Sequence, residues 1–211
     1  IRRPPRSTPS NSSAASDVYK RQAPRSLVLI ELTEPWGEYY AQNQRSAPPL
    51  IYAEVVTQSG VPFDGFGLEI RFGRAGAGMR VRDLLEVSHL LDRFAPLGKQ
   101  VHLAGTQVPS SPDPRDKNLK SGPAGSWHGP WTERLQAQWL DQLYRIALSR
   151  PYVETITWKD LVDNDQGVLQ HGGLLKKDYT AKEAFTKFTE LKKELLRPER
   201  AYLKTPPEAD K

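Results

Sequence analysis

Two patterns of apolar and polar residues alternate along the chain between residues 26 and 196. Short apolar runs typical of buried strands recur, and stretches with apolar residues three and four positions apart, typical of amphipathic helices, separate them. The predicted strands are 26–35, 64–72, 101–108 and 153–161, and the predicted helices are 47–60, 81–98, 132–149 and 180–196. Strands that alternate with helices at this spacing predict a parallel sheet with helical crossovers.

The four βα units predict an α/β fold that is half of a (β/α)8 barrel, because a complete barrel takes eight units and about 250 residues. A four-stranded doubly wound sheet is the alternative. Many sheets of that kind carry a phosphate-binding loop, and GRAGAG at 73–78 has the wrong glycine spacing for one. We therefore interpret 73–78 as a flexible turn.

The predicted strand at 64–72 has two distinct faces, since successive side chains of a strand point to opposite sides. The apolar face holds Phe66, Leu68, Ile70 and Phe72, and the other face holds Gly65, Gly67, Glu69 and Arg71. The first set suits packing against helices. The second suits a barrel interior that becomes polar at the carboxyl end, where barrel enzymes keep their sites. A structural ion pair between Glu69 and Arg71 is the alternative to a site.

Charge is concentrated at the start of the chain. The formal net charge is +5, and the first 22 residues hold five basic side chains against one acidic one, Asp17. The rest is close to neutral, which argues against nucleic acid as a partner. We interpret 1–22 as disordered and non-native, because SSAASDVYKRQ resembles translated sequencing-adapter read-through. The predicted domain is 23–197, followed by a polar tail at 198–211, and we expect the chain to be a fragment.

Several kinds of catalytic site, cofactor and partner have no support in the sequence. The chain has no cysteine, and its histidines, His89, His102, His128 and His171, show no metal-ligand spacing, so we expect no metal and no cofactor. No apolar run approaches the roughly 20 residues of a membrane span, so we expect no membrane partner. No G-x-S-x-G motif indicates serine catalysis. No signal peptide is visible.

Four segments follow one another in a characteristic order: VPFDGFGLEIRF, LGKQVHLAGTQV, ETITWKDLVD and HGGLLKKDYTAKEAF. The first three resemble the sixth, seventh and eighth strands of glycoside hydrolase family 10, the endo-β-1,4-xylanases, and the fourth resembles the segment that ends the barrel in that family. The resemblance covers about 26–196. It implies the C-terminal half of a (β/α)8 barrel and hydrolysis of β-1,4-xylan with retention. Members are usually extracellular or periplasmic.

The resemblance also implies a missing acid. The family nucleophile is the Glu of a Thr-Glu pair that ends the seventh strand, and the aligned residues here are Ala104 and Gly105. Glu69 stands where the family usually has Gln, and Arg71 where it has His. The acid/base residue ends the fourth strand, in the missing N-terminal half. Gly105 therefore stands at the position of an absent nucleophile, with Glu69, or else Glu31, as the expected substitute. A sequence error of one base is another explanation for the glycine.

Aromatic side chains suit a polysaccharide or oligosaccharide ligand, because sugars present apolar C–H faces. Trp158 matches the family tryptophan of the eighth strand. Trp36 follows the first strand of this chain, and Trp127 and Trp131 close a long loop at 109–131. Together with Glu69, Arg71 and His171, these are the candidate substrate-binding residues, while Trp139 is expected in the core.

Three functions stay open at this point. The chain is an enzyme fragment of a xylanase-like hydrolase, a non-catalytic carbohydrate-binding barrel, or a half-barrel whose inner charges form only ion pairs. An Asn-Glu pair ending an upstream strand would favour the first.

Overall fold

The computed structural model describes residues 26–195, apart from residues 42, 44, 75, 77 and 113–124, together with Val18 and Gln22. Apart from those two residues, the predicted disordered start at 1–22 and the polar tail at 198–211 lie outside the described residues.

Four parallel strands form the sheet, in the order β1-β2-β3-β4. They are β1 (Leu29–Leu32), β2 (Gly65–Arg71), β3 (Gln100–Gln107) and β4 (Val153–Trp158). Each of the four lies inside a predicted strand or within one residue of it. The predicted parallel, sequential sheet is therefore confirmed.

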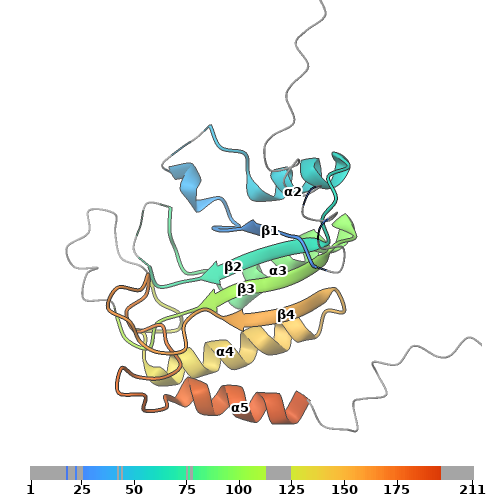
Figure 1. The fold of residues 1–211 in the computed structure, drawn as a ribbon. Coiled ribbons are helices and arrows are strands. Elements are labelled where there is room, and N and C mark those ends of the chain that lie inside the picture. The colour runs from blue at the N-terminus through green and yellow to red at the C-terminus, as the bar shows by residue number, and fades with distance from the viewer. Residues whose placement is uncertain are drawn as a thin grey trace, which may run out of the picture.

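Each strand is followed by a helix, as predicted. The helices are α2 (Pro49–Gln58), α3 (Leu84–Phe94), α4 (Glu133–Leu148) and α5 (Glu183–Leu195), with short 3-10 segments η1 (Glu38–Ala41) and η2 (Ala95–Leu97). Figure 1 shows α2 beside β1 and α4 beside β4, with α5 packed on the other side of α4. Asp83 sets the start of α3, since its side chain accepts a hydrogen bond from the Glu86 amide. Thr132 caps α4 in the same way, through the amide of Leu135.

The two faces of β2 divide as the alternation predicts. Phe66, Leu68 and Ile70 are fully buried, and the Phe66 ring meets Phe94 of α3 edge to face, with centroids 5.5 Å apart. On the opposite face, a Cβ built on Gly67 would lie 3.3 Å from the Cβ of Ala104. The apolar face of β2 therefore packs on the helices. The face with the glycines and the charged residues lies on the inner side of the sheet.

A β-bulge in β3 changes which residues reach the inner side. Gly67 pairs with His102 and Glu69 pairs with Gly105, so two steps along β2 correspond to three along β3. Such an extra residue re-aims the side chains that follow it. Ala104 and Gly105 consequently both face inner-side residues of β2: Ala104 faces Gly67, and Gly105 faces Glu69.

We predict that residues 23–211 expressed alone will self-associate, because among the described residues β1 and β4 each pair with one strand only, and open edges template association. Leu29→Lys, on the exposed β1 edge, is expected to weaken this association, whereas Leu148→Lys, on the exposed end of α4, is the matched control. Sedimentation velocity over a range of concentrations measures the change. A concentration-independent monomer would contradict the half-barrel.

Candidate functional site

Glu69 is the buried carboxylate at the carboxyl end of the sheet. Its side chain is only 4% exposed and forms ion pairs with Arg71, two residues further along β2, and with Lys159, which directly follows β4. The Lys159 Nζ lies 2.7 Å from one Glu69 oxygen, and the Arg71 guanidinium binds the other. A buried charge needs such partners. The Glu69–Arg71 ion pair, which the sequence left open as the alternative to a site, is thus present, with a second cation that the sequence did not indicate.

Gly105 lies directly beside this ion pair. A Cβ built on Gly105 would lie 3.1 Å from the Cδ of Lys159 and 3.3 Å from Glu69 Oε1. Both neighbours are parts of flexible side chains, so a larger residue at 105 requires them to move by a few tenths of an ångström. The space in which a side chain at 105 would begin is therefore crossed by Lys159 on its way to Glu69.

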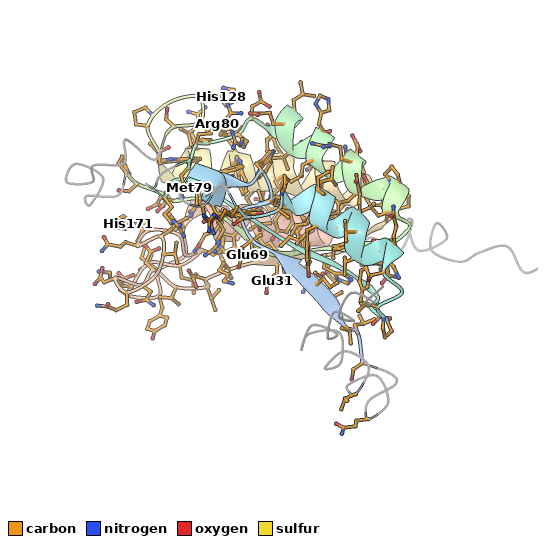
Figure 2. All side chains as sticks on the ribbon, turned by 90° about the horizontal axis from the view of Figure 1, so that it is seen from above. Glu31, Glu69, Met79, Arg80, His128 and His171 are labelled. Carbon is orange, nitrogen blue, oxygen red and sulfur yellow. The ribbon has the colours of Figure 1, made fainter. Side chains whose placement is uncertain are left out.

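A small pocket of about 30 Å³ opens next to Glu69. Figure 2 shows Glu69 and Glu31 near the middle of the molecule with Met79 close by, while His128 and His171 lie toward its periphery. The pocket brings together three of the predicted site residues. Its wall includes Trp36, Glu38, Glu69, Arg71, Arg74 and Met79.

Trp36 is held at this pocket by an aromatic and a cationic neighbour. Its ring lies 5.6 Å from that of Phe72, and the Arg82 guanidinium carbon lies 5.4 Å from the ring centroid. The second contact is a cation–π interaction. The residue is half-buried, so part of the indole remains open.

Glu38 is a pocket residue that the sequence analysis missed. It is buried on η1, with one carboxylate oxygen 3.7 Å from Arg82 and the other without a hydrogen-bond partner. Burial raises the pKa of this carboxyl, while backbone hydrogen bonds at Glu38 and Trp36 oppose the shift. The polar run around residue 38 carried no periodicity that would have marked it as buried.

The other predicted tryptophans lie outside this pocket. Trp127 and Trp131 are buried in the hydrophobic core, and Trp158 packs edge to face on Trp139, with centroids 6.1 Å apart. The Trp158 indole N–H donates to the carbonyl of Gly172 at 2.8 Å. Trp139 is fully buried, as expected. Contact of Trp127, Trp131 or Trp158 with a glycan stays a prediction.

His171 lines a separate and wider hollow of about 440 Å³, together with Ser110, Asp163 and Lys182. Lys182 is buried there and donates to Asp163 at 2.6 Å, to Ser110 at 2.9 Å and to the carbonyl of Gly173 at 3.0 Å. Burial lowers the pKa of Lys182, and the bond to Asp163 opposes that shift. The cluster joins the loop after β3, the loop after β4 and the residue that precedes α5.

Removing Lys182 is predicted to destabilise this junction. Lys182→Met leaves the Asp163 carboxylate buried without its cation, which typically costs about 3–5 kcal/mol. Lys177→Met is the control, because Lys177 pairs with Asp165 in an exposed ion pair worth about 0–1 kcal/mol. Urea unfolding of the two variants measures both values. Equal losses would contradict the assignment of Lys182 as a buried structural cation.

In the described part of the chain, no three or more metal-ligating side chains form a cluster, and no helix is long and apolar enough to cross a membrane.

Comparison with known proteins identifies similar solved structures. The chain matches no protein-family model and no curated protein. Its fold matches xylanase 10B from Thermotoga maritima with a TM-score of 0.61 at 18% identity, over 87% of this chain and 52% of that one. Xylanase 10B from Thermotoga petrophila RKU-1, in complex with xylobiose, gives 0.60 at 17%, over 90% and 53%. A GH10 endoxylanase from a sugarcane soil metagenome gives 0.58 at 17%, over 85% and 53%.

The chain thus spans about half the length of these xylanases. At such identities the likeness establishes the fold. The four parallel βα units are an α/β fold that matches part of the (β/α)8 barrel of glycoside hydrolase family 10 xylanases, as the sequence resemblance predicted.

Proposed function

We propose that residues 23–197 form the C-terminal half of a family 10-type barrel, which binds β-1,4-xylan or a related plant or algal polysaccharide without hydrolysing it by the retaining route. The observation that carries this proposal is Gly105, which lies at the carboxyl end of β3 and faces Glu69 across the bulge. A retaining glycosidase needs an acid/base and a nucleophile about 5–5.5 Å apart. Glycine supplies no nucleophile, and Lys159 crosses the space where one would begin.

The N-terminal half of the same barrel is the proposed partner. Two features support this: β1 and β4 each pair on one side among the described residues, and the similar xylanases are about twice as long as this chain. Four more parallel strands between β4 and β1 would complete eight. The expected acid/base residue belongs to that half, so neither half is catalytically complete alone.

We predict that the 211-residue chain binds xylohexaose, measured by isothermal titration calorimetry, and releases no reducing sugar from it. Trp36→Ala is expected to weaken binding by about tenfold, because an open indole supplies a stacking surface worth roughly 1.4 kcal/mol. Trp139→Phe, at a buried core position, is the control. Failure to bind any xylo-oligosaccharide would reject the proposed function.

Restoring the acid is predicted to restore hydrolysis only in a completed barrel. With the natural N-terminal half present, Gly105→Glu combined with Lys159→Ala and Glu69→Gln should raise hydrolysis of 4-nitrophenyl xylobioside by orders of magnitude, because a nucleophile and its partner act as a unit. Lys159→Ala makes room for the new side chain, and Glu69→Gln removes the carboxylate that would repel it. Gly105→Gln with the same two substitutions is the matched control, which has the same size without the charge. Equal rates in the two would show that residue 105 is not the nucleophile position.

A hydrolase that uses Glu69 is the alternative function. It is supported by the position of Glu69 Oε1, 3.3 Å from the point where a Cβ of residue 105 would lie. In this case the unmodified completed barrel hydrolyses the aryl xylobioside, and Glu69→Gln lowers kcat at least about a hundredfold. Glu31→Gln is the comparison, since Glu31 lies beside Gly67 on the same face.

A further inference from the structure

Helix α2 is apolar on two faces, and the described part of the chain covers one of them. Pro49 and Ala53 are buried on the first face. Ile51, Tyr52 and Val55 share the second face, where they are 49%, 43% and 60% exposed. Exposed apolar side chains that lie together in this way mark interaction surfaces. The second face of α2 therefore indicates a partner surface beside β1, the strand that α2 accompanies in Figure 1.

A hollow of about 270 Å³ lies between the carboxyl end of β1 and the start of α2. Leu32 of β1, Tyr39 of η1 and Tyr52 of α2 are among the residues that line it. In the described sheet β1 pairs with β2 only, so the other edge of β1 is open. The end of β1 thus combines an open strand edge with a hollow that has aromatic and aliphatic walls.

The opposite edge of the sheet presents an exposed leucine at the matching height. Leu161 lies shortly after the end of β4 at Trp158, and it is 57% exposed. Its backbone is held in place, because its carbonyl accepts a hydrogen bond from the Leu175 amide at 2.8 Å. If β4 paired in parallel with the β1 strand of another copy, the carboxyl ends of both strands would lie on the same side of the sheet. Leu161 would then lie at the hollow of that copy.

We infer that two copies of this chain close into one eight-stranded barrel, in which β4 of each copy pairs with β1 of the other and Leu161 enters the hollow beside Tyr52. A two-fold rotation about the barrel axis keeps all strands parallel and makes the same contact twice, so the assembly closes at two copies. Eight strands enclose an interior that side chains can fill. This dimer leaves no open strand edge, whereas pairing of two β1 edges would leave both β4 edges open.

The inference concerns assembly and does not depend on glycan binding. The second copy takes the surface that we assign to an N-terminal half in a longer chain, so the two partners exclude each other. The carboxyl ends of all eight strands lie on one side of the dimer, and the pocket next to Glu69 therefore occurs twice at one barrel mouth.

Sedimentation equilibrium of the 211-residue chain tests the stoichiometry. We expect a species of two copies that does not grow as the concentration rises, because the closed dimer uses both edges of each sheet. Leu161→Lys should raise the dissociation constant at least about a hundredfold, since each dimer buries this leucine twice. Leu85→Lys is the matched control, because Leu85 is 62% exposed on α3, which follows the inner strand β2. Larger oligomers, a monomer, or equal effects of the two substitutions would overturn the inference.

Cross-linking tests which edges meet. The chain has no cysteine, so Tyr52→Cys and Leu161→Cys each carry a single thiol. The two variants are produced separately and also together in one cell, and each preparation is treated with a short bismaleimide. We expect a cross-linked dimer only from the joint preparation, because the two-fold axis places equal positions on opposite sides of the barrel. A cross-link in Tyr52→Cys alone would show that like edges pair, and its absence from the joint preparation would show that β1 and β4 do not meet; either result would overturn the inference.

Discussion

The buried Glu69 carboxylate constrains the whole carboxyl end of the sheet. A charge on an inner face must find cations, and Glu69 finds one on its own strand and a second, Lys159, that follows β4. Lys159 reaches Glu69 by passing over Gly105 of β3, so one ion-paired group connects three strands. A side chain at 105 would compete with Lys159 for this space. The glycine at 105 and the carboxylate at 69 are therefore parts of one arrangement.

The fold was predictable because its determinants are local and periodic. The alternation in 64–72 assigned Glu69 and Arg71 to the inner face and Phe66 to the helix side, and the structure has both assignments. Thr132 caps α4 at the first residue of the predicted helix 132–149, whereas α3 starts at Leu84, three residues inside the predicted helix 81–98. The predicted ends were less accurate: the first strand is confined to Leu29–Leu32, since the polar residues after it form turns and η1 rather than sheet.

The site was less predictable because its decisive features are not periodic. The bulge between Gly67 and Glu69 adds a residue in β3 that no pattern in 101–108 indicates, and it places Gly105 opposite Glu69. Lys159 and Glu38 are polar residues that follow strands, and no pattern distinguishes them from exposed ones. In the structure, Lys159 reaches past Gly105 to Glu69, and Glu38 is buried next to the site. Tryptophan identity alone also did not separate the half-buried Trp36 from the core residues Trp127 and Trp131.

Three departures from the xylanase pattern become consistent once the contacts are considered together. A Glu at 105 beside Glu69 would place two carboxylates at one buried position, where like charges repel and one must take up a proton. With glycine at 105, Glu69 is paired with two cations, because Arg71 supplies one and Lys159 passes through the space beside Gly105 to supply the other. A single-base error at codon 105 would explain the glycine but not Glu69 and Arg71. Their mutual fit favours a rebuilt site over an accidental loss, which agrees with the proposed binding of a glycan without retaining hydrolysis.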